Sequence, residues 1–188
     1  MGRIVVSEFV SLDGVMEDPG GAEGSEFGGW TMPYWNDELG AFKLEELFAC
    51  DAMLLGRVTY LGFAAAWPSM TDEQGFADRM NNSPKYVVSS TLSATEWNNS
   101  HLLTGDPSEA VAGLKRDVAG DILVAGSATL VQTLMRNGLV DDLRLAMYPI
   151  VLGAGKKLFG DGGHTPLELV TADPTTTGVI LHTYRRAE

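Results

Sequence analysis

Apolar and polar positions along the chain follow two spacings, one typical of buried strands and the other of amphipathic helices. The segment 3–10 is apolar with β-branched residues in its middle, which predicts a strand. Between the predicted N-cap Asn36 and Phe48, apolar residues recur at helical spacing. The predicted strands are 3–10, 52–55, 86–89, 122–125, 143–151, 167–170 and 179–184. The predicted helices are 36–48, 56–67, one that begins at Asp106-Pro107, and 126–138.

The order of these elements predicts the fold class. Strands that alternate with helices form a mainly parallel sheet with right-handed crossovers, and the last two strands form an antiparallel pair that closes it. A chain of 188 residues is long enough for one α/β domain and short for two, so we expect residues 1–188 to form a single α/β domain.

The segment after the first strand is a long loop. It runs to about Pro33 and contains six glycines. A loop of this length in a compact domain is either disordered or a functional lid. Trp30, Tyr34 and Trp35 need surface to pack on, so we expect a lid whose tryptophans supply stacking surface.

Composition excludes several classes of partner and compartment. With 25 acidic and 13 basic residues the net charge is −12, which disfavours nucleic acid and anionic membrane as partners. The single cysteine, Cys50, indicates a reducing compartment. The N-terminus does not resemble a signal peptide, and no apolar run is long enough to span a membrane. We therefore expect a cytoplasmic protein.

Three predicted strand-to-helix junctions carry small or hydroxyl residues. They are Gly56-Arg57-Val58-Thr59, Ser89-Ser90-Thr91 and Gly126-Ser127-Ala128-Thr129. Each of them, taken alone, is better explained as a capped helix start. Because helix N-termini at the carboxyl ends of parallel strands bind anions, three in succession favour a nucleotide-like ligand.

Other common site motifs are missing from the sequence. Neither G-x-G-x-x-G nor the P-loop pattern occurs, and no G-x-S-x-G elbow is present. The three histidines, His101, His164 and His182, are isolated from one another, so we expect no metal site.

Several segments carry a resemblance to one family. The segment 55–60, LGRVTY, resembles the start of the cofactor helix in dihydrofolate reductases. The segment 122–143 is similar to the reductase domain of the riboflavin-pathway deaminase-reductase, as are 11–14, 148–155 and 158–160. The resemblance implies a dihydrofolate-reductase-like three-layer fold that binds NADPH in extended form across the sheet.

The resemblance also implies roles for individual residues. Arg57 and Thr59 would meet cofactor phosphates, in the turn that Gly56 and Val58 complete. The hydroxyl residues would line the adenosine end: Ser89, Ser90 (a candidate for the 2′-phosphate) and Thr91. The diphosphate would be wrapped by Gly126, Ser127, Ala128, Thr129 and Leu130. The nicotinamide would lie near Leu12, Asp13 and Ala125.

The function that follows is NADPH-dependent hydride transfer to a C=N or C=O bond of a small substrate, similar to 5-amino-6-(5-phosphoribosylamino)uracil reductase. Riboflavin-pathway members typically show Glu-Gly-Gly where this chain has Ala125-Gly126-Ser127. The substrate therefore stays open, with a dihydrofolate or pterin reductase as one alternative. A non-catalytic protein that binds a nucleotide or small ligand is another, and a module for a protein partner is a third.

Two carboxylates are candidates for the catalytic acid. Asp13 follows the first strand, where it either caps its own turn or positions the substrate. Glu38, in the first turn of the helix expected to face the cleft, resembles the substrate carboxylate of dihydrofolate reductases or else stabilises the helix dipole.

A homodimer is also expected. Leu143, Leu145, Met147 and Ile150-Val151 offer more apolar surface than one monomer core needs.

Overall fold

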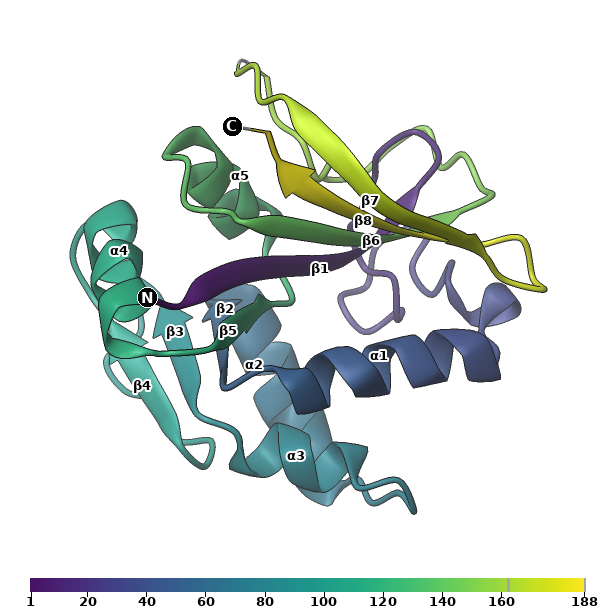
Figure 1. Ribbon diagram of the computed structural model, residues 1–188. Helices are drawn as coiled ribbons and strands as arrows, with labels where there is room; N and C mark the ends of the chain where they lie inside the picture. The colour runs from purple at the N-terminus through teal and green to yellow at the C-terminus, as the bar shows by residue number, and fades with distance from the viewer. Residues whose placement is uncertain (162, 188) are drawn as a thin grey trace.

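The computed structural model describes residues 1–161 and 163–187, and its centre is one eight-stranded sheet with helices on both faces (Figure 1). The strands are β1 (Arg3–Ser11), β2 (Ala52–Gly56), β3 (Lys85–Val88), β4 (Ser100–Leu103), β5 (Asp121–Val124), β6 (Asp142–Tyr148), β7 (Leu167–Pro174) and β8 (Ile180–Arg186). The α-helices are α1 (Asp37–Ala49), α2 (Arg57–Ala66), α3 (Phe76–Asn82), α4 (Pro107–Asp117) and α5 (Ala128–Arg136), and the 3-10 helices are η1 (Met32–Tyr34) and η2 (Trp67–Ser69).

The sheet has the order β4-β3-β2-β5-β1-β6-β8-β7. The six strands from β4 to β6 are parallel, whereas β8 is antiparallel to β6 and β7 to β8. This is the α/β fold that the sequence predicts, with a mainly parallel sheet and a C-terminal antiparallel pair.

The two faces of the sheet are covered by different helices. One apolar cluster joins the sheet to α4 and α5 through residues such as Val111 and Leu134, and a second joins it to α1, α2 and α3 through Leu47, Tyr60 and Met80. The helices lie on opposite sides of the sheet in Figure 1. The expected three layers are therefore present.

Two predicted features of β6 need correction. The strand ends at Tyr148 and not at position 151, because Pro149 has no amide hydrogen to continue the ladder and the chain turns, with Ile150 N donating to Tyr148 O. Leu143 and Leu145 are buried against α4 and α5 within the chain, so they supply no apolar surface to a dimer.

The segment from Val15 to Pro33 is folded onto the sheet. The Asp18 carboxylate accepts hydrogen bonds from the amides of Glu23 and Ser25. Trp30 is buried, and its ring packs edge to face on that of Tyr148, with 5.2 Å between the ring centroids. Trp30 therefore belongs to the core and does not supply the stacking surface expected of it.

Within the described part of the chain, no helix combines the length and apolar character that crossing a membrane needs.

Candidate cofactor groove

Two strand-to-helix junctions, after β2 and β5, and the turn after β3 meet at one edge of the sheet, around a groove with a volume of about 550 Å³. The expected strand-to-helix junction at Ser89-Ser90-Thr91 needs correction, because a loop and then β4 follow β3. Parallel strands end at the same edge, so the turns that follow β2, β3 and β5 are brought together there. A volume of this size is typical of ligand sites. The groove is lined by Gly56, Arg57, Val58, Val88, Ser89, Ser90, Thr91, Gly105, Pro107, Ser127, Thr129, Leu130 and Thr133.

Nine of the fourteen predicted cofactor residues are in this lining. Of the others, Thr59, Gly126 and Ala128 lie at the same junctions, whereas Leu12 and Ala125 lie at the ends of β1 and β5. Four lining residues were not predicted from the sequence: Val88, Gly105, Pro107 and Thr133. The sequence did contain an indication of Pro107, because the Asp106-Pro107 helix start is another strand-to-helix junction, after β4.

The first and third junctions are locked together by close contacts between glycines and hydroxyl groups. Gly56 N donates to Gly126 O at 3.1 Å. A Cβ atom added to Gly56 would lie 2.4 Å from Ser127 Oγ, and one added to Gly126 would lie 2.6 Å from Thr59 Oγ1. A side chain at either glycine would therefore force the facing hydroxyl side chain or its turn to shift. The peptide bond between Gly126 and Ser127 is cis.

The helices α2 and α5 present their N-termini to the groove. Among the described residues, neither has a side chain that caps its first amides, whereas the Asp106 carboxylate caps α4. Free N–H groups and the positive end of the helix dipole make such N-termini binding sites for phosphate groups. Arg57, in the first turn of α2, is exposed and adds a full positive charge.

The three hydroxyl groups in the turn after β3 have different surroundings. Ser89 is buried, and its Oγ accepts hydrogen bonds from the amides of Thr91 and Leu92. Its hydroxyl therefore holds the turn. Ser90 and Thr91 are exposed in the groove lining and are free to face a ligand.

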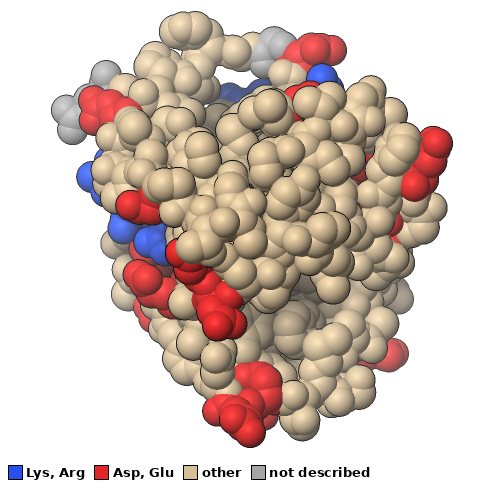
Figure 2. All heavy atoms as spheres, turned by 90° about the vertical axis from the view of Figure 1, so that its right-hand side faces the viewer, with Lys and Arg blue, Asp and Glu red and all other residues tan. Residues whose placement is uncertain are grey.

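The face toward which β1 runs is largely neutral at its centre and bordered by acidic side chains (Figure 2). It is hollowed below the centre of that view, with few Lys or Arg side chains in sight. Acidic neighbours oppose an anionic ligand, so binding of phosphates depends on local groups, namely Arg57 and the helix N-termini.

Asp13 ties the turn after β1 to the segment after β6. Its carboxylate accepts hydrogen bonds from Ser11 Oγ at 2.7 Å, Leu152 N at 3.1 Å and Gly153 N at 2.9 Å. These bonds hold its pKa well below the usual range, at about 2. Asp13 is therefore ionised at neutral pH, which favours the positioning role over proton donation.

We expect Asp13→Asn to make the fold less sensitive to acid. The pKa of Asp13 is lower in the folded than in the unfolded chain, so its contribution to stability is complete above about pH 4 and is lost as the pH falls toward about 2. Urea unfolding at several pH values in this range should show a shallower loss of stability in the variant. An identical acid dependence in both proteins would contradict this role.

Glu38 is directed at the β7–β8 turn. Its Oε2 accepts hydrogen bonds from Thr176 N, Thr176 Oγ1 and Asn36 Nδ2, each at 2.7 Å. These bonds lower the pKa of Glu38, which is fully exposed. The expectation that it faces the cleft needs correction, because the carboxylate pins the start of α1 to the turn.

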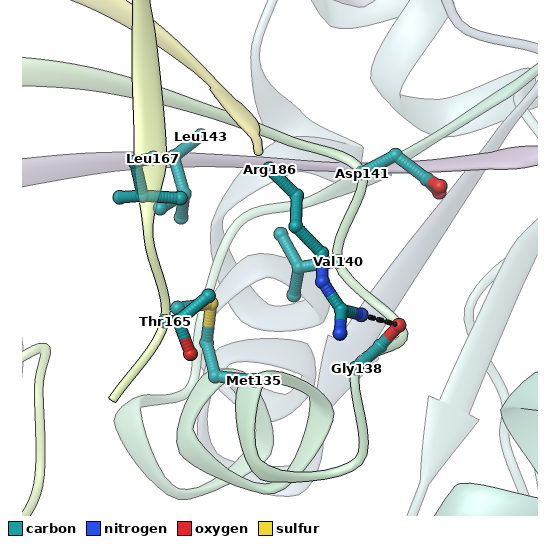
Figure 3. Close-up of a pocket in the computed structure, with 8 residues that line it drawn as sticks. All are labelled: Met135, Gly138, Val140, Asp141, Leu143, Thr165, Leu167 and Arg186. Atoms are coloured by element: carbon teal, nitrogen blue, oxygen red, sulfur yellow. Dashed lines mark hydrogen bonds between the residues drawn. The ribbon is translucent and has the colours of Figure 1, made fainter. Parts of the chain in front are cut away.

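A second cavity, shown in Figure 3, lies where β6 begins and β8 ends. Its volume is about 10 Å³, which holds at most one water molecule. Arg186 Nη1 donates to Gly138 O at 2.8 Å beside it. This cavity is a packing feature.

Fold and groove together define a dihydrofolate-reductase-like α/β protein. The model of the RibD C-terminal domain family matches residues 3–181, and the chain belongs to that family. Over 186 residues it is 29% identical to the uncharacterized protein YyaP of Bacillus subtilis (strain 168), with 97% of this chain and 94% of that protein covered.

Two solved structures share the fold. A protein from Shewanella sp. PV-4 assigned to riboflavin biosynthesis matches with a TM-score of 0.77 at 20% identity, over 99% of each chain. The dihydrofolate reductase of Enterococcus faecalis, complexed with NADP(H), matches with a TM-score of 0.63 at 16% identity, over 99% of this chain and 97% of that one.

Proposed function

We propose that this protein is an NADPH-dependent reductase that transfers a hydride to a C=N or C=O bond of a small, flat substrate. The observation that carries the proposal is the single groove formed by two junctions and the turn after β3, with the uncapped N-termini of α2 and α5 and the guanidinium of Arg57 in its lining. The family and the likeness to a reductase complexed with NADP(H) support it.

The residues present fit an extended dinucleotide. The α5 N-terminus from Gly126 to Leu130 would hold the diphosphate on backbone amides, and Arg57 and Thr59 would bind phosphate oxygens through charge-assisted and neutral hydrogen bonds. Ser90 and Thr91 would line the adenosine end. Leu12 and Ala125 would border the nicotinamide. When bound, the cofactor supplies the hydride, and the protein aligns the reactants and excludes water.

Aromatic side chains near β1 support a flat substrate. Trp35 is 48% exposed, and its ring lies 6.1 Å from that of Phe9, which projects from β1. An exposed aromatic face beside the end of β1 offers a surface on which a heterocycle can stack. Trp35 thus takes the role that the sequence assigned to the loop tryptophans.

Turnover with a substrate panel tests the proposal. Absorbance of NADPH is followed while imines, pterins and pyrimidine carbonyl compounds are added to the native protein. Oxidation of NADPH that depends on both protein and substrate is the expected result. Binding of NADPH with no turnover across the panel would instead indicate a ligand-binding protein, and absence of binding would contradict the groove assignment itself.

We also propose that the protein forms a homodimer. The outermost strand, β7, exposes Leu169 and Val170, and Leu169 is 57% exposed. An edge strand with apolar side chains is commonly covered by symmetric pairing. Light scattering at micromolar concentration should give twice the chain mass of 20.2 kDa. A mass of one chain would contradict the dimer.

A further inference from the structure

β1 carries a carboxyl group in its buried interior. Glu8 lies on β1 between Val6 and Val10, which belong to the apolar cluster under α4 and α5, and only 8% of it is exposed. A buried carboxylate is costly unless charge and hydrogen bonds compensate it. The groups around Glu8 therefore decide its protonation state.

Those groups leave the Glu8 carboxyl only partly compensated. The backbone N–H of Gly126 favours the charged form and lowers the pKa of Glu8. Its Oε1 has no hydrogen-bond partner among the residues that the structure describes. From β6 the register places the apolar Leu145 beside Glu8, and on β8 His182 follows next to Leu145.

Lys43, whose charge acts on Glu8, forms an ion pair with a different carboxylate. Lys43 and Glu46 of α1 both act on Glu8 through their charges. Lys43 Nζ lies 2.8 Å from Glu46 Oε2 and donates to Ser7 Oγ at 2.5 Å, while Ser7 Oγ donates to Glu46 Oε2 at 2.6 Å. Because Glu46 neutralises Lys43, Glu8 has no counterion of its own within the described chain.

Burial therefore controls the protonation of Glu8. It raises the pKa of Glu8 to about 8, and the negative charge of Glu46 acts in the same direction. Lys43 and the Gly126 amide act in the opposite direction. At neutral pH the group is mostly a neutral acid that can donate a proton.

Glu8 lies where the sheet opens. Pairing between β1 and β5 ends at Val6 and Val124, whereas pairing between β1 and β6 continues to Ser11 and Tyr148. Glu8 is thus in the part of β1 beyond its β5 neighbour, at the Gly126 turn that closes the groove. Phe9, the next residue along β1, projects from the opposite face of the sheet, where the exposed Trp35 packs on it.

We propose that Glu8 is the catalytic acid of the reduction, for a substrate bound over the opening between β1 and the Gly126 turn. This assignment rests on the proposed reductase function. Bound NADPH would supply the hydride to the substrate C=N or C=O carbon and leave as NADP⁺. Glu8 would give its proton to the nitrogen or oxygen of the same bond, and its carboxylate would regain a proton from solvent.

The isosteric change Glu8→Gln tests the assignment. Turnover should fall by at least about 100-fold while NADPH affinity is kept, the usual scale for an acid–base group. In the native protein kcat/KM should decline as the pH rises through about 8, and the residual activity of the variant should lose that decline. Native turnover in Glu8→Gln would overturn the assignment but leave the reductase proposal intact, whereas a native protein without NADPH turnover would overturn both.

A spectroscopic titration of the cofactor-free protein gives a readout that does not depend on activity. The infrared band of a buried protonated carboxyl group should disappear with a midpoint near pH 8 in the native protein and be missing in Glu8→Gln. Glu46→Gln should shift this midpoint to lower pH, because it removes a negative charge and frees Lys43. Lys43→Met should shift it to higher pH. A carboxyl band that is absent near neutral pH, or that survives in Glu8→Gln, would overturn the proposal.

Discussion

Replacing Gly126 by alanine is expected to abolish NADPH binding while leaving the fold intact. Gly126 has a φ of +93°, in the left-handed region that residues with a Cβ rarely adopt. The added Cβ would also lie 2.6 Å from Thr59 Oγ1, so the Thr59 side chain or the turn after β5 must move. The proposed phosphate site uses the N-termini of both α2 and α5, so a shift of one relative to the other should weaken binding. We expect the affinity for NADPH to fall by at least about 100-fold, or ~2.7 kcal/mol.

The matched control is Gly75→Ala. Gly75 has a similar φ of +77°, but a Cβ there would meet Phe48 Cζ at 3.9 Å, an ordinary van der Waals distance, and the position precedes α3 away from the groove. Both variants carry the left-handed strain of about 1–2 kcal/mol, so thermal unfolding should show a loss in each, larger in Gly126→Ala because of its close contact. Calorimetric titration should show lost NADPH binding only in Gly126→Ala. Equal affinities in the two variants would contradict the role of the close contact.

Replacing Lys85 by methionine is expected to cause the largest loss of stability. Lys85 is fully buried at the start of β3, and its Nζ donates to the carbonyl oxygens of Met80, Asn81 and Ser83 at 2.8–3.0 Å. The ammonium also lies 4.3 Å from the centre of the Trp97 ring. Methionine keeps the volume but leaves the last carbonyls of α3 unpaired, at a cost of about 1–3 kcal/mol for each fully desolvated group.

Burial of the charge offsets part of this loss. It lowers the pKa of Lys85 to about 8, so removing the ammonium also removes a desolvation cost. We expect a net loss of about 3 kcal/mol in the free energy of unfolding, measured with urea at neutral pH. Lys156→Met, which breaks the exposed ion pair with Glu17, is the comparison and should cost less than about 1 kcal/mol. Similar losses in the two variants would show that the three carbonyl contacts contribute little.

Much of the fold could be predicted because the elements that build it are periodic and well capped. Asn36 accepts the hydrogen bond from Leu39 N that starts α1, and Asp106 caps α4 as its sequence indicates. The elements that were missed are short. α3 has seven residues and begins after a left-handed glycine, Gly75, which hides its start. β4 has four residues and is defined by its pairing with β3, which no local pattern records.

The groove was predictable from local chemistry, whereas the proposed acid, Glu8, was not. Glycines and hydroxyl groups at strand ends have a meaning that follows from the sheet direction alone. The bonding partners of Asp13 and Glu38 are about 140 positions away along the chain, so their positioning roles depend on tertiary contacts. The sequence does contain one indication of Glu8, because a lone carboxylate between Val6 and Val10 interrupts an otherwise apolar face of the first strand.

Calorimetric titration of the native protein with NADPH and with NADH tests the central claim most directly. The groove assignment predicts one binding site, tighter for NADPH because Arg57 and the exposed hydroxyls of Ser90 and Thr91 meet its additional phosphate. Arg57→Ala should weaken NADPH by about 1.5–3 kcal/mol, or roughly 10- to 150-fold. Arg116→Ala, on the exposed side of α4, should leave the affinity unchanged. Equal affinity for NADPH and NADH would contradict the groove assignment, and so would an Arg57→Ala variant that binds NADPH as tightly as the native protein.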